Sequence, residues 1–98
     1  MTNKIGITKN QRKDFQRLIE QFKFQDEFMT SSLLTLQKNK DPIRYGRLSR
    51  LWENSKQTLA AYAKQGDLRG FEKCIHANQE FIDQMLVGKI NLFNSVDQ

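Results

Sequence analysis

The amino-acid sequence predicts an all-α protein, a small antiparallel bundle of three or four helices that forms one domain. Apolar residues recur through most of the chain at the spacing of one helix face. Residues that favour helix ends separate the apolar runs, and the short connections between them favour antiparallel neighbours. The 98 residues include only one proline and five glycines, whereas an all-β domain of this length needs a turn every ~8 to 12 residues.

The first predicted helix covers residues 9–38. Thr8 and Gln11 have the spacing of a capping box, in which each side chain bonds to the backbone N–H of the other residue, so the helix begins at Lys9. The apolar residues of this segment fall on one face. They are Phe15, Leu18, Ile19, Phe22, Met29, Leu33 and Leu36.

The length of this helix is large for a small globular bundle. An unbroken helix over the segment is about 45 Å long, whereas a compact chain of this size has a radius of gyration of only ~13 Å. We therefore expect a break near residues 30–32, because the hydroxyl groups of Thr30, Ser31 and Ser32 compete for backbone hydrogen bonds and suit a new N-cap. The alternative is a continuous helix whose far half packs on another molecule.

The second predicted helix covers residues 42–65. Asn39 is expected to end the first helix in the left-handed conformation. Asp41 then caps the second helix, and Pro42 takes its first position, where the missing N–H has no helical partner to lose. Gly66 provides the C-terminal stop. The apolar face comprises Leu48, Leu51, Trp52, Leu59 and Tyr62.

The third predicted helix covers residues 67–87. Asp67 is its expected N-cap, and Gly88 its expected stop. Its apolar face comprises Leu68, Phe71, Ile75, Phe81, Ile82 and Met85. The remaining residues, 89–98, form a tail that we expect either to fold back on the bundle or to contact a partner.

The largest apolar side chains of the three faces define the expected core: Trp52, Phe15, Phe22, Leu59, Phe71 and Phe81. One short bundle does not cover every apolar residue of the chain. The residues left over predict self-association as a homodimer. They are Leu33, Leu36, Ile90, Leu92 and Phe93.

The chemistry-bearing residues do not form a recognisable catalytic or metal site. Cys74 and His76, the only cysteine and the only histidine, point about 200° apart on a helix and cannot share a metal ion. The glycines are isolated, so there is no phosphate-binding loop. We therefore expect a protein that is not an enzyme and that needs no cofactor. The absence of an apolar stretch long enough to cross a bilayer and of a signal sequence predicts a cytoplasmic location.

The net charge of +5 favours an anionic partner. Five of the basic residues lie within residues 38–50, which contain a single acid, Asp41, and so carry a local charge of +4. Arginine grips phosphate or carboxylate with two parallel hydrogen bonds, and a tyrosine adds stacking or a hydroxyl contact. The predicted binding residues are Lys38, Lys40, Arg44, Tyr45, Arg47 and Arg50.

A second basic stripe lies on the first helix, opposite its apolar face. It comprises Lys9, Arg12, Lys13, Arg17 and Lys23, with Glu20 as the main acid among them. Such a stripe either neutralises backbone phosphates or is the ordinary solvated side of a bundle helix.

Three functions fit this sequence. The first is a small accessory protein that contacts the nucleic-acid backbone, within a larger nucleoprotein complex. The second is an adaptor or inhibitor whose basic patch docks on an acidic protein. The third is an interfacial helix on an anionic membrane; we favour it least, because the bundle needs the same apolar face for its core.

Overall fold

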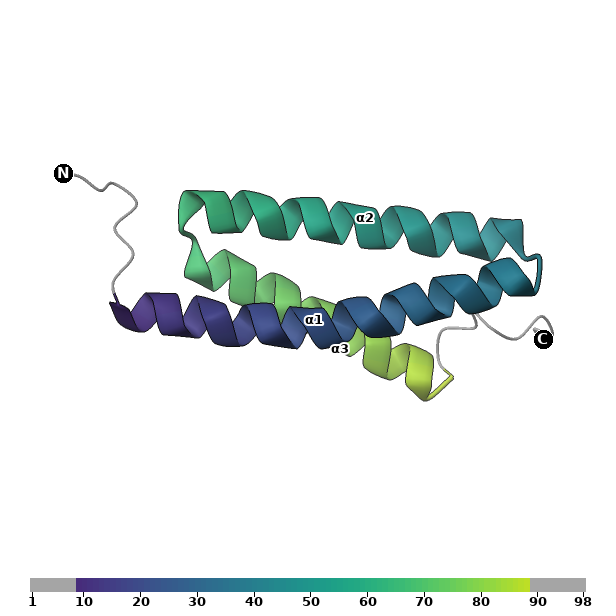
Figure 1. The fold of residues 1–98 in the computed structure, drawn as a ribbon, viewed down its shortest axis with the longest axis horizontal. Helices are drawn as coiled ribbons and strands as arrows, with labels where there is room; N and C mark the ends of the chain where they lie inside the picture. Colours follow the sequence, from purple (N-terminus) through teal and green to yellow (C-terminus); the bar gives the residue numbers. More distant parts are fainter. Residues whose placement is uncertain (1–8, 89–98) are drawn as a thin grey trace.

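The computed structural model describes residues 9–88, which form three helices: α1 (Lys9–Lys38), α2 (Pro42–Gln65) and α3 (Leu68–Leu86). Within these residues there is no strand, so the predicted all-α class is confirmed. Figure 1 shows the chain running along α1, back along α2 and forward again in α3. Whether a fourth helix exists stays a prediction, because the tail 89–98 lies outside the described residues.

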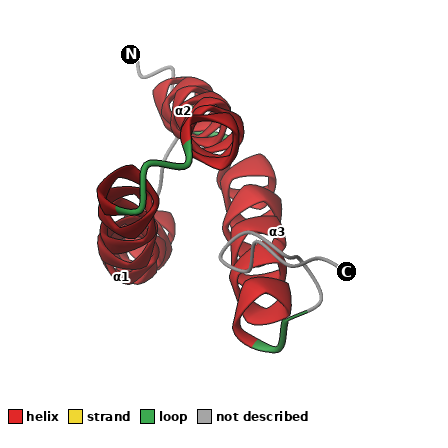
Figure 2. Ribbon diagram, turned by 90° about the vertical axis from the view of Figure 1, so that its right-hand side faces the viewer, coloured by secondary structure: helices red, strands yellow, loops and turns green. Residues whose placement is uncertain are grey.

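Each helix packs against the other two, but α3 is inclined to the α1–α2 pair. Figure 2 views α1 and α2 nearly along their axes, whereas α3 extends across the same view. The resulting molecule is elongated, with extents of 56 × 22 × 17 Å and a radius of gyration of 16.0 Å. This shape accommodates a helix as long as α1.

The predicted break in α1 is wrong, because the helix is continuous from Lys9 to Lys38. The Ser32 hydroxyl donates to the Phe28 carbonyl over 2.9 Å, and the Thr35 hydroxyl donates to the Ser31 carbonyl over 3.1 Å. These hydroxyls therefore bond back into the preceding turn instead of capping a new helix, a pattern that bends helices. Figure 1 shows α1 bending toward α2 over its C-terminal half.

The far half of α1 is covered by this same chain. Met29 and Leu36 are buried in a first core cluster with residues from the start of α2 and the end of α3. Leu36 is only 1% exposed, so its predicted role in self-association is wrong, and Leu33 is half-buried against the same cluster. Self-association itself stays a prediction, since Ile90, Leu92 and Phe93 lie outside the described residues. The first core cluster comprises Met29, Leu36, Leu48, Trp52, Ile82 and Met85.

A second core cluster fills the other end of the bundle, near the α2–α3 connection. Its buried residues are Phe15, Leu18, Leu59, Phe71 and Ile75. The rings of Phe15 and Phe71 meet edge to face with centroids 5.3 Å apart. Of the six expected core residues, Phe15, Trp52, Leu59 and Phe71 are buried, whereas Phe22 and Phe81 are half-buried against the clusters. Two residues expected on apolar faces, Ile19 and Leu51, are 40% and 38% exposed.

Polar side chains from all three helices meet in the interior. The Gln25 side-chain amide of α1 donates to the Ile75 carbonyl over 3.0 Å and to the Gln79 side chain over 3.2 Å. The Ser55 hydroxyl of α2 donates to Asn78 Oδ1 of α3 over 2.7 Å. These contacts fix how the helices are aligned along one another, since a shift of one helix separates the partners.

The helix ends follow local capping chemistry. Asp41 accepts from the Arg44 backbone N–H, Pro42 is the first residue of α2, and Gly66 ends α2 with a left-handed φ of 70°, as predicted. The Asp67 side chain caps α3 by accepting from the Gly70 N–H over 2.9 Å. The left-handed residue after α1 is Lys40, with φ of 55°, and the prediction of Asn39 is therefore wrong by one position. The Asp41 N–H reaches back to the Leu36 carbonyl, which fixes the tight turn.

Candidate functional site

The α1–α2 turn brings the predicted binding residues to one end of the molecule. Within it, Arg44 is committed to an internal contact: its guanidinium lies 2.7 Å from the Asp41 carboxylate, and its side chain is only 21% exposed. The hydrogen bond from this guanidinium lowers the pKa of Asp41, and the backbone hydrogen bond and charge of Arg44 act in the same direction. Arg44 and Asp41 therefore neutralise each other at the start of α2.

Four other basic side chains at this end are exposed and, among the described residues, have no acidic partner within ion-pairing distance. We name them the turn cations: Lys38, Lys40, Arg47 and Arg50. Arg47 and Arg50 are one helical turn apart on the side of α2 that points away from the buried Leu48 and Trp52. The turn cations thus carry uncompensated positive charge from the end of α1 to the third turn of α2.

A surface hollow lies at the same turn, beside Lys40. We name it the turn hollow; it is lined by Gln37, Lys40, Asp41, Pro42 and Tyr45. Tyr45 is half-buried because its ring packs against the first core cluster. Two of the predicted binding residues, Lys40 and Tyr45, therefore share this hollow. Sequence reasoning missed Gln37 and Pro42 as lining residues, because nothing in their local pattern distinguishes a hollow from a filled turn.

Exposed apolar residues accompany the basic ones on α2. Ile43 is 71% exposed and Leu51 is 38% exposed. Ile43, Arg47 and Leu51 are spaced four residues apart, so they form one row along the helix surface. This row combines apolar and basic side chains, a composition common at protein interfaces.

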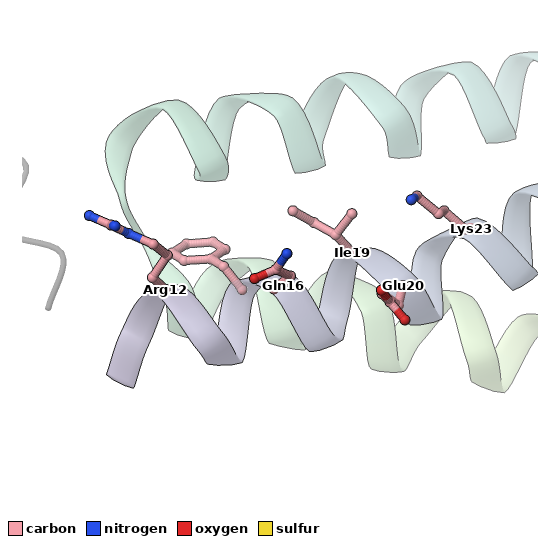
Figure 3. Close-up of a pocket in the computed structure, with 6 residues that line it drawn as sticks. Arg12, Gln16, Ile19, Glu20 and Lys23 are labelled. Carbon is pink, nitrogen blue, oxygen red and sulfur yellow. The ribbon is translucent and has the colours of Figure 1, made fainter. Parts of the chain in front are cut away.

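The second predicted site is the basic stripe of α1, and its role in binding stays a prediction. All five basic residues are exposed, but only Arg12 and Lys23 line the hollow drawn in Figure 3, together with Phe15, Gln16, Ile19 and Glu20. Figure 3 shows Ile19 and Lys23 pointing toward α2. Lys9, Lys13 and Arg17 do not line this hollow, and Arg17 pairs with Asp14 over 3.3 Å.

The residues considered for metal or nucleophilic chemistry are apart or engaged elsewhere. No three or more His, Cys, Asp or Glu side chains in residues 9–88 are arranged to hold a metal ion. Cys74 is half-buried, with its sulfur 3.8 Å from the Ser55 hydroxyl. His76 is exposed beside an open hollow with Glu80 and Asp83. None of α1, α2 and α3 is long and apolar enough to cross a membrane.

Comparisons with known proteins give no match: no family model fits the chain, and no curated protein or solved structure is significantly similar to it.

Proposed function

We propose that this protein is a non-enzymatic, cytoplasmic accessory protein, built as one antiparallel bundle, that binds the phosphate backbone of nucleic acid through the turn cations. The observation that carries the proposal is the exposure of all four cations with no acidic partner in the described part of the chain. Basic side chains bind a nucleic-acid backbone by displacing its condensed counterions, and each contact adds a salt-dependent increment of affinity.

The distribution of charge supports a polyanion over a small anion. The turn cations extend from the end of α1 along α2 instead of converging on one point. Arg47 and Arg50 offer planar guanidinium groups on adjacent turns, and these groups suit the oxygens of successive phosphates. Helix α3 carries two basic and three acidic residues, so it is the least favourable part of the bundle for a polyanion. The charge pattern therefore orients the nucleic acid toward the turn.

The test is binding of a fluorescein-labelled oligonucleotide of mixed sequence, followed by fluorescence anisotropy. We expect Arg47→Glu/Arg50→Glu to abolish binding, because both side chains are exposed and their reversal places negative charge at the contact. The matched control is Lys9→Ala/Lys13→Ala/Arg17→Ala, which removes three basic residues outside the turn. Loss of binding in the control and full binding in the arginine variant would assign the site to α1 instead.

A second candidate function, docking on an acidic protein as an adaptor or inhibitor, is favoured by the row formed by Ile43, Arg47 and Leu51. An exposed large apolar residue on either side of an arginine suits a protein interface better than a phosphate backbone. Ile43→Ser with Leu51→Ser separates the two functions. Unchanged oligonucleotide binding by this variant supports the nucleic-acid function. The adaptor function is supported if a protein co-purifies with the wild type after nuclease treatment and is lost from the variant.

A further inference from the structure

We propose that the turn hollow binds one unpaired nucleobase, so that the ligand of this protein is single-stranded nucleic acid. The inference rests on the proposed contact between the turn cations and a phosphate backbone. It adds a second element, a pocket that a base enters only when the base is not paired and stacked inside a duplex.

The lining of the turn hollow suits an aromatic heterocycle. Tyr45 supplies an aromatic ring, and the Pro42 ring adds a rigid apolar surface beside it. Base stacking on aromatic side chains is a main source of affinity for single strands and tolerates any base sequence. The hollow measures about 300 Å³, at the lower end of the usual range for ligand sites, ~300 to 1,000 Å³. One base is a ligand of suitable size.

Polar groups at the hollow match the edge of a base. The Gln37 side-chain amide offers both a donor and an acceptor, and its residue is exposed at the end of α1. The Asp41 carboxylate already accepts hydrogen bonds from the Arg44 backbone and side chain. Arg44 thereby offsets the repulsion that a bare carboxylate would exert on a nearby phosphate. Lys40 lines the hollow as well, and Lys38 lies two residues before it. A base in the hollow therefore has cations beside it for the adjoining phosphates.

The hollow is held in shape before any ligand binds. Tyr45 packs against the first core cluster, Pro42 has a fixed φ, and the Asp41 N–H bonds to the Leu36 carbonyl over 3.0 Å. Because these groups are already ordered, binding a base loses little conformational entropy. The geometry thus favours a preformed site over one that folds around its ligand.

The test compares three probes whose fluorescein-labelled strand has the same number of phosphates: a single-stranded oligodeoxynucleotide, the same strand paired with an unlabelled complement, and an oligomer of abasic residues. We expect the wild-type protein to bind the single strand at least about fivefold more tightly than the other two, from the stacking of one base. Gln37→Ala and Tyr45→Leu should reduce this preference, whereas Tyr45→Phe should keep it. Gln57→Ala is the matched control, because Gln57 is an exposed glutamine of α2 that does not line the turn hollow.

The outcomes separate the two proposals. Equal, salt-dependent binding of all three probes overturns the nucleobase inference and leaves the proposed function intact. A single-strand preference that survives both Gln37→Ala and Tyr45→Leu also overturns it, because the base then lies elsewhere. Binding of none of the probes overturns the proposed function and the inference together. Circular dichroism of each variant establishes that it is folded, and the exposed Gln37 provides a test that does not depend on the half-buried Tyr45.

Discussion

Trp52 illustrates how a single residue joins the helices of this bundle. Its ring is 2% exposed and stacks on Phe22 of α1, with centroids 5.5 Å apart and an interplanar angle of 12°. The indole Nε1–H donates to the Asp26 carboxylate over 2.7 Å. The buried ring therefore keeps its one polar group satisfied, as tryptophan in a core usually does. Its burial was predictable because it lies on the apolar face of α2; its partner on α1 was not, because the sequence leaves the alignment of α1 and α2 open.

Replacing this ring tests the core directly. Trp52→Ala should lower the free energy of unfolding by ~3 to 5 kcal/mol, because it removes a large buried side chain and leaves a cavity. Urea denaturation followed by circular dichroism measures the change. A loss below about 1 kcal/mol would show that the ring contributes little to the core. Trp52→Phe should have a smaller effect, since it keeps most of the packing and removes the hydrogen bond to Asp26.

The lowered pKa of Asp41 should make the stability of the protein depend on pH. The hydrogen bond from the Arg44 side chain lowers the pKa of Asp41 in the folded protein below its usual value of 3.8. An acid with a depressed folded pKa stabilises the protein above its unfolded pKa, and this contribution is lost as the pH falls through the folded pKa. The melting temperature of the wild type should therefore exceed that of Asp41→Asn at neutral pH, and the difference should shrink below about pH 4. A difference that stays constant down to pH 2 would contradict this account; asparagine is used because it remains a good N-cap.

At the scale of whole helices, the sequence predicted the ends better than the middle. Asp41, Gly66 and Asp67 act as predicted because capping depends on a few neighbouring residues. The prediction of a break at residues 30–32 was wrong because a hydroxyl group can either cap a new helix or bond back to a carbonyl of the preceding turn. Burial of Ser32 against the rest of the bundle favours the bond to the Phe28 carbonyl, and that burial depends on residues distant in the sequence.

Two glycines within helices should respond oppositely to the same substitution. A Cβ added at Gly70 of α3 would collide with the Tyr62 ring of α2, whereas a Cβ at Gly46 meets no atom within 4 Å. Gly46→Ala should stabilise the protein by ~0.5 to 1 kcal/mol, since alanine favours the helix. Gly70→Ala should destabilise it, because the close approach of α2 and α3 leaves no room. Thermal unfolding of the two variants checks the pair, and stabilisation by Gly70→Ala would contradict the tight packing of this hairpin.

The buried contact between α2 and α3 gives a double-mutant test. Asn78 accepts from the Ser55 hydroxyl, and its amide nitrogen has no hydrogen-bond partner. Ser55→Ala alone should reduce stability by ~1 to 3 kcal/mol, because it leaves the buried Asn78 carbonyl oxygen without its donor. Ser55→Ala with Asn78→Leu should recover most of this loss, since both polar partners are then absent. A double variant less stable than Ser55→Ala would show that Asn78 has another essential role.

At the scale of the whole molecule, the sequence located the charge but not its surroundings. Lys38, Lys40, Arg47 and Arg50 were predictable as a group because they lie close together in the chain. The commitment of Arg44 to Asp41 follows from the cap geometry. The turn hollow was not predictable, because it depends on how Gln37 of α1 lies against Tyr45 of α2. The five basic residues of the α1 stripe are all exposed, as their helical spacing opposite the apolar face predicts.

The central claim is that the turn cations bind nucleic-acid phosphates, and the salt dependence of binding tests it most directly. The association constant of the wild type and of Arg50→Gln for a single-stranded oligonucleotide is measured by anisotropy over a series of salt concentrations. Four phosphate contacts predict a slope of log K against log salt of about −3 for the wild type. Arg50→Gln should make this slope shallower by about 0.7 to 1. Identical slopes for the two proteins, or a wild-type affinity that does not change with salt, would contradict the account.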